Sequence, residues 1–141
     1  MAQAQRPPAS PRRRRGAAES LGSIVLGFES VVVFLAGLVV YGLGALPASI
    51  PSWSGIVAGA VLGLLMIVTA GLLRHRWAFW VGWALQLLLG LGAFLVPAIL
   101  LVFLIFGGLW AYATIKGMQL DARNARLATE TDPRPDAANG D

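Results

Sequence analysis

Glu29 is the residue whose type and position most need a chemical explanation. It lies in an apolar run, eight positions after Leu21. In a membrane-spanning helix, a rise of about 1.5 Å per residue places its carboxyl about 12 Å deep, near the middle of the bilayer. A charged side chain there costs roughly 2.5–3.5 kcal/mol. Glu29 is therefore a candidate for binding and releasing a proton or cation in a transport cycle, or for a permanent hydrogen bond between helices as a protonated acid.

Gln86 is a second polar residue at the same expected depth. It lies nine positions after Trp77, a point on the same side of the membrane, which gives about 13 Å. Gly82 and Gly90 share its helical stripe and let a neighbouring backbone approach, so that the glutamine can bond across. We predict that Glu29 and Gln86 face each other, within a chain or between subunits. The alternative is that each bonds carbonyl groups of its own helix.

A second stripe of small residues consists of Gly55, Gly59 and Gly63. Tandem spacing of small residues by four positions permits close van der Waals packing of helices. The spacing indicates a helix contact rather than chemistry. The contact is either within the chain or a seam between copies of a homo-oligomer.

Residue types needed for most catalytic and metal sites are scarce. The chain has no cysteine and one histidine, which excludes disulfides, thiolate ligands and a multi-histidine metal site within one chain. It shows no Ser–His–Asp set, phosphate loop or nucleotide fingerprint. We therefore predict no catalytic, cofactor-binding or metal site, and a role other than that of an enzyme.

The elements that must position these side chains are membrane-spanning helices. Only Glu29, Arg74 and Arg76 carry formal charges between Leu21 and Ile115. Of the 141 residues, 57% are hydrophobic and 13% charged, whereas soluble domains have about 25% charged residues. Too little polar surface remains to face water, so the sequence predicts an all-α membrane protein.

Four spans in two hairpins are expected within a transmembrane domain covering residues 18–120. The spans cover about residues 21–46, 53–73, 77–94 and 97–115. The last two share 39 apolar residues, barely enough for two crossings, so a re-entrant hairpin is the alternative. Pro97 is expected to begin the fourth span, because proline suits the first turn of a helix.

The two ends of the chain have a composition typical of disorder. Residues 1–17 contain five arginines and three prolines, and residues 130–141 contain two prolines and three aspartates. Apolar residues at helical spacing predict that the fourth helix continues as a cytoplasmic extension over residues 116–129.

The distribution of basic residues predicts the orientation. All eleven Lys and Arg lie in the N-terminal tail, the Arg74–Arg76 loop or the segment from Lys116 onward. The two opposite loops contain none, so the positive-inside rule places both termini in the cytoplasm. Arg74, Arg76 and Lys116 are the expected topology anchors. Because the basic residues flank apolar spans, the net charge of +4 indicates a lipid bilayer with anionic headgroups as partner, not nucleic acid.

The segment Glu19–Glu29, ESLGSIVLGFE, follows a run of arginines and resembles a small actinobacterial membrane family known as domain of unknown function 4233. The Arg74–Trp77 junction and the four-span plan are similar too. The resemblance covers about residues 12–120 and implies an uncharacterised protein of the bacterial plasma membrane. It carries over no functional residues.

Two functions are consistent with these patterns. The first is an accessory or structural membrane subunit that acts through helix–helix contacts with another membrane protein or with copies of itself. The second is a small proton-coupled transporter or oligomeric channel that uses Glu29. The small multidrug-resistance transporters also have four spans and a glutamate in the first helix, which is a similarity of architecture alone.

Overall fold

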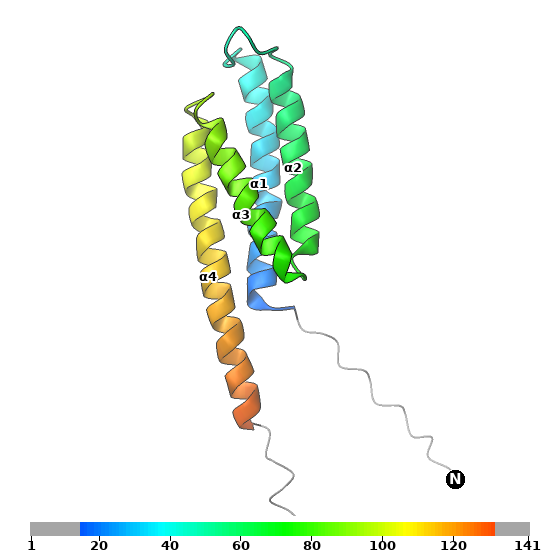
Figure 1. Cartoon of the computed structure of the whole chain (residues 1–141), viewed down its shortest axis with the longest axis vertical. Coiled ribbons are helices and arrows are strands. Elements are labelled where there is room, and N and C mark those ends of the chain that lie inside the picture. The colour runs from blue at the N-terminus through cyan, green and yellow to red at the C-terminus, as the bar shows by residue number, and fades with distance from the viewer. Residues whose placement is uncertain (1–14, 132–141) are drawn as a thin grey trace, which may run out of the picture.

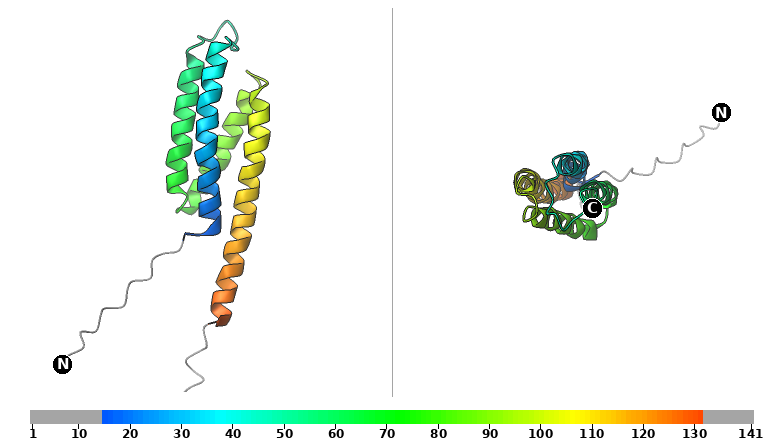
Figure 2. Two further views of the ribbon diagram at one scale, coloured as in Figure 1. Left: turned by 180° about the vertical axis from the view of Figure 1, so that it is seen from behind. Right: turned by 90° about the horizontal axis from the view of Figure 1, so that it is seen from above.

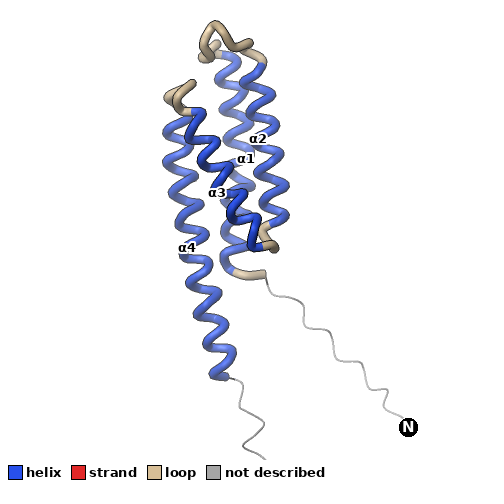
Figure 3. Tube along the Cα trace, viewed as in Figure 1, coloured by secondary structure: helices blue, strands red, loops and turns tan. Residues whose placement is uncertain are grey.

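The computed structural model describes residues 15–131, in which four helices follow one another (Figure 1). They are α1 (Ala17–Gly42), α2 (Ser54–Leu72), α3 (Arg76–Gly92) and α4 (Ile99–Thr131). No strand occurs within residues 15–131 (Figure 3), which confirms the all-α prediction. The predicted disordered tails fall mainly on residues 1–14 and 132–141, which lie outside the described residues.

The helix boundaries differ from the predicted ones at the first and last spans. α1 begins and ends four residues earlier than the predicted span over residues 21–46. α4 begins at Ile99 rather than at Pro97, because Pro97 lies in the preceding turn. There the Ile99 N–H bonds the Val96 carbonyl at 2.9 Å, and the Leu100 N–H bonds the Pro97 carbonyl at 3.0 Å. α4 then continues without interruption to Thr131, so the region over residues 116–129 is helical and α4 is the longest helix, with 33 residues.

The helices form two hairpins, and α3 runs diagonally between them (Figures 1 and 2). The start of α1, the α2–α3 loop and the far part of α4 lie at one end of the bundle, hereafter the basic end. The α1–α2 and α3–α4 loops lie at the other, charge-free end. α3 starts beside α2 at the basic end and finishes beside α4 at the charge-free end, because short loops join it to both.

Three helices, α1, α2 and α4, are long and apolar enough to cross a membrane. Many large apolar side chains on them are exposed, including Phe28, Leu64 and Leu104. Such a surface suits hydrocarbon as the solvent and not water. The chain is therefore a membrane protein. α3 has only 17 residues, below the roughly 20 needed for a simple crossing.

The glycine stripe of α2 packs directly on α1. A Cβ atom added to Gly59 would lie 3.0 Å from both the Gly37 Cα and the Val33 carbonyl oxygen, and one added to Gly63 would lie 2.9 Å from the Ser30 carbonyl oxygen. These neighbours are backbone atoms, so the two helices touch closely only because the side chains are absent. The stripe is thus used within the chain, and it is not a free seam for another copy.

Candidate functional site

Glu29 and Gln86 meet in the interior of the bundle, with exposed fractions of 0% and 2%. The Gln86 Nε2 donates a hydrogen bond to the Glu29 Oε2 at 2.6 Å. The predicted contact is therefore present, within one chain, between α1 and α3. It joins the two hairpins, since α1 belongs to one and α3 to the other.

The other buried polar side chains of the helices behave differently. The hydroxyls of Ser30, Thr69 and Thr114 donate to carbonyl oxygens of their own helices at 2.7–2.8 Å. A Ser or Thr hydroxyl in a membrane helix often donates to a carbonyl oxygen of its own helix. The alternative in which Glu29 and Gln86 also bond their own helices is not what the structure shows.

Two oxygens of the pair are left without a partner among the described residues. These are the Glu29 Oε1 and the Gln86 Oε1, and both are buried. On α4, a Cβ added to Gly107 would lie 3.5 Å from the Gln86 Oε1. A carboxylate here would have one amide donor and a bare oxygen, which is costly in an apolar interior. The chemistry open to the pair is therefore binding of a proton, or of another small donor, at these oxygens.

Trp110 on α4 lies next to the pair on the side of the basic end. Its ring fits between two glycines: a Cβ on Gly22 of α1 would lie 3.2 Å from the Trp110 Cζ3, and a Cβ on Gly82 of α3 would overlap the ring. Trp110 is 0% exposed, and its Nε1 has no hydrogen-bond partner within the described part of the chain. Gly82, predicted to mediate helix packing, therefore makes room for an indole ring and not for a backbone.

Gly90, eight residues after Gly82 on α3, also lies against an aromatic ring of α4. A Cβ there would lie 3.1 Å from the Phe103 Cε2 of α4. The contacts of this α3 stripe therefore alternate between two helices. Gly82 and Gly90 lie against aromatic rings of α4, and Gln86 between them bonds Glu29 of α1.

Two cavities lie on either side of the pair. The first, about 380 Å³, is apolar, lies toward the charge-free end, and includes Val33 and Leu89 in its lining. The second, about 810 Å³, lies at the basic end and includes Trp83 and Thr114. On α3, Gln86 lies between Leu89 and Trp83, about one helical turn from each. The Glu29–Gln86 pair and Trp110 line neither cavity. Along the bundle they lie between the two linings, and we call these three side chains the septum.

The predicted topology anchors lie at one end of the molecule. Arg74 lies in the α2–α3 loop, Arg76 is the first residue of α3 and Lys116 is on α4, and all three are exposed. No group of three or more metal-ligating side chains occurs in residues 15–131 that could hold an ion.

Asp121 is a structural residue that the sequence did not reveal. Its two carboxylate oxygens accept hydrogen bonds from the backbone N–H groups of Ala17 and Ala18, at 2.6 and 3.2 Å. The first turn of α1 has no side-chain cap of its own, so α4 supplies the acceptors that an N-cap residue normally provides. Gly117 of α4 contacts Ala18 closely enough to exclude a Cβ. The pairing crosses more than 100 positions of sequence, so no local pattern could have indicated it.

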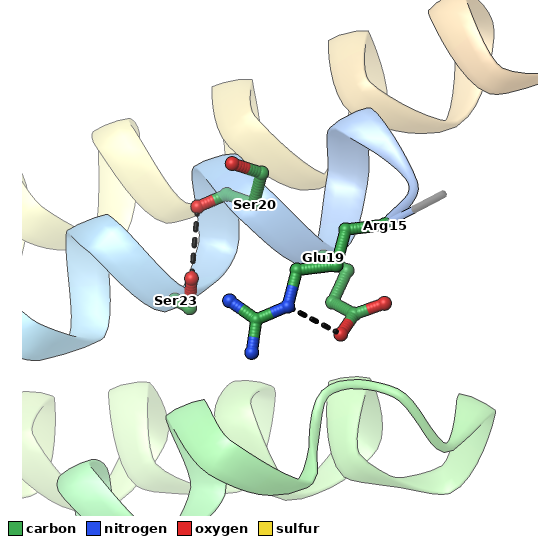
Figure 4. A network of polar contacts seen from close by, with 4 residues as sticks. All are labelled: Arg15, Glu19, Ser20 and Ser23. Carbon is green, nitrogen blue, oxygen red and sulfur yellow. Dashed lines mark hydrogen bonds and ion pairs between the residues drawn. The ribbon is translucent and has the colours of Figure 1, made fainter. Parts of the chain in front are cut away.

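A smaller polar group lies at the start of α1 (Figure 4). The Arg15 Nε lies 3.5 Å from the Glu19 Oε1, and the Ser23 hydroxyl donates to the Ser20 carbonyl at 2.9 Å. Both contacts are local and exposed in part, so they stabilise the helix start only modestly.

The model of a family described as "Protein of unknown function (DUF4233)" matches residues 20–126. The chain belongs to this family. The family suggested by the sequence is thereby confirmed, over residues 20–126 rather than 12–120. No curated protein and no solved structure matches the chain. In this DUF4233 protein the matched residues include Glu29, Gln86, Trp110 and Asp121, so all parts of the septum and the acceptor for α1 lie inside the family region.

Proposed function

We propose that this DUF4233 protein lies in the bacterial plasma membrane with all four helices across the bilayer and the basic end in the cytoplasm. The absence of Lys and Arg from residues 43–53 and 93–98 supports this orientation. α3, with 17 residues, is about 25 Å long at about 1.5 Å per residue. Because α3 runs diagonally (Figure 1), its span along the bundle is shorter than this length, and local thinning of the bilayer accommodates the difference.

We further propose that the protein is a small proton-coupled transporter with Glu29 as its proton site. The observation that carries this proposal is the septum, a buried carboxyl and amide between two cavities on opposite halves of the bundle. Carriers need a barrier between their two sides whose opening depends on what it binds. Intramembrane acidic residues that face the bundle interior are typical of proton relays.

The mechanism follows from the hydrogen bonding of the pair. With a proton on the Glu29 carboxyl, the pair is neutral and the α1–α3 contact is stable. When the proton leaves, the carboxylate retains only the amide of Gln86 as donor. A bare charge of this kind must gain solvation, so α3 shifts and opens the septum toward the cavity that supplies water.

Proton movement by the purified full-length chain tests this proposal. Liposomes containing the protein and a trapped pH-sensitive dye receive an imposed pH gradient. We expect proton flux with the natural chain and, for Glu29→Gln, a fall to the level of protein-free liposomes. Glu130→Gln is the matched control, because it makes the same change at an exposed carboxyl near the end of α4, outside the lining of both cavities. Equal flux through the natural chain and Glu29→Gln would exclude Glu29 as the proton site.

An accessory membrane subunit is the second candidate, and exposed aromatic side chains favour it. Phe28, Trp80 and Phe94 are exposed by 69%, 78% and 88%, and a membrane partner or a second copy could cover them. The surface around Gly59 cannot bind a partner, because it is buried against α1. This role predicts that Glu29→Gln is silent in cells, while Phe94→Ala removes a partner captured by cross-linking in the membrane.

A further inference from the structure

The cavity at the basic end has the size and position of a ligand site. Its volume of about 810 Å³ is within the range of about 300–1,000 Å³ that is usual for small-molecule sites. The start of α1, the end of α2, α3 and α4 all contribute to its lining. α3 leaves α4 toward this end (Figures 1 and 2), and the cavity lies where the two helices separate.

The charged residues of the lining give the cavity a positive character. Of its two carboxylates, Glu19 pairs with Arg15 at 3.5 Å. Asp121 accepts two N–H groups from the first turn of α1, where the helix dipole also compensates its charge. Arg76 lines the same cavity and is exposed, so its positive charge faces the space that a ligand would occupy.

The remaining lining is largely apolar and aromatic. Trp80 and Trp83 are exposed by 78% and 40%. Phe79, Leu73 and Met118 complete the apolar part of the lining. Indole rings favour the boundary between headgroups and hydrocarbon. A ligand that matches both the positive and the apolar residues of the lining has an anionic head and an apolar chain.

We propose that this cavity binds one anionic phospholipid. Its phosphate lies against the guanidinium of Arg76, which can offer two parallel N–H donors to phosphate oxygens. Its hydrocarbon chain lies against Trp80 and Trp83, between α3 and α4. This site is specific, unlike the general attraction of basic flanks to lipid, and it does not depend on whether Glu29 moves protons.

Native mass spectrometry of the full-length chain in mild detergent tests the site, with phosphatidylglycerol and phosphatidylcholine as probes. We expect one tightly held phosphatidylglycerol per chain and weaker retention of phosphatidylcholine. Arg76→Gln should weaken phosphatidylglycerol binding about fivefold, since one basic residue near anionic lipid contributes about that factor. Arg123→Gln removes the same charge from exposed α4 outside the lining and should leave binding unchanged. Equal losses in both variants would overturn a specific site.

A change of volume without a change of charge provides the second measurement. Ala122→Trp fills the cavity from α4, whereas Ala125→Trp places the same ring on an exposed position outside the lining. Both variants should keep the helical circular dichroism of the natural chain, and only Ala122→Trp should lose the lipid. Inorganic phosphate is added as competitor: displacement of phosphatidylglycerol by phosphate alone, sensitive to Arg76→Gln, would show a soluble-anion site and overturn the assignment to lipid.

Discussion

The contact between Glu29 and Gln86 is a polar interaction between two largely apolar helices. Its single hydrogen bond of 2.6 Å leaves one oxygen on each side chain without a partner among residues 15–131. An interaction of this kind holds two helices together and is also easily changed by a proton, because a carboxyl can become a donor. The two roles discussed for Glu29 therefore rest on one geometry, and they differ in whether the proton ever leaves.

A double-mutant cycle measures the strength of the contact. Glu29→Leu and Gln86→Leu each remove one partner, and the double variant removes both. We expect a coupling free energy of about 0.6–1.7 kcal/mol, the range of hydrogen bonds between membrane helices. The measurement is reversible unfolding in mild detergent. Glu29→Leu combined with Thr69→Val is the control, since Thr69 bonds its own helix. Zero coupling between positions 29 and 86 would mean that the contact contributes nothing to stability.

At the scale of elements, glycines decide how closely each helix approaches its neighbour. α1 and α2 meet backbone to backbone at Gly37, Gly59 and Gly63. α4 instead inserts the ring of Trp110 against Gly22 and Gly82. The same residue type therefore serves two kinds of packing, one between backbones and one between a ring and a backbone.

Gly59→Ala is expected to destabilise the α1–α2 contact. The added Cβ would lie 3.0 Å from two backbone atoms of α1, which cannot rotate away as a side chain can, so overpacking of about 1–3 kcal/mol is expected. Gly71→Ala is the matched control, because the space around Gly71 on the same helix is open. It should be neutral or stabilising by up to about 1 kcal/mol. Thermal unfolding in detergent compares the two, and equal stability of both variants would contradict the close α1–α2 packing.

At the scale of the whole molecule, charge and polarity divide the bundle into two unlike halves. The basic end has the arginines, the Asp121 contact with α1 and the larger cavity. The charge-free end has an apolar cavity and loops without Lys or Arg. The diagonal α3 connects the halves (Figure 1) and carries Gln86 between them.

The chain lacks cysteine, so single introduced cysteines report the topology without background. With a membrane-impermeant maleimide, we expect Ser52→Cys and Ala98→Cys to be labelled from outside intact cells. Arg123→Cys should be labelled only after permeabilisation, because positive flanks stay in the cytoplasm. Labelling of Ala98→Cys only after permeabilisation would mean that α3 and the start of α4 form a re-entrant hairpin.

Much of the site could be predicted from sequence, because the depth of a residue in the membrane follows from its position along its own helix. The positions of Glu29 and Gln86 along their helices gave equal depths, and the small residues at 82 and 90 marked the face of α3 that packs inward. The sequence could not indicate Trp110 as the third part of the septum. Its partners Gly22 and Gly82 belong to other helices, and no spacing within α4 encodes them.

The sequence by itself determined the helices and their apolar environment, because composition and hydrophobic length act locally along each segment. Only the tertiary structure decided that the α2 glycines pack inside the chain, that α3 crosses diagonally, and that Asp121 supplies acceptors to Ala17 and Ala18. These features depend on which helix faces meet. In a membrane interior, where most faces are equally apolar, close packing and a few polar contacts select the arrangement.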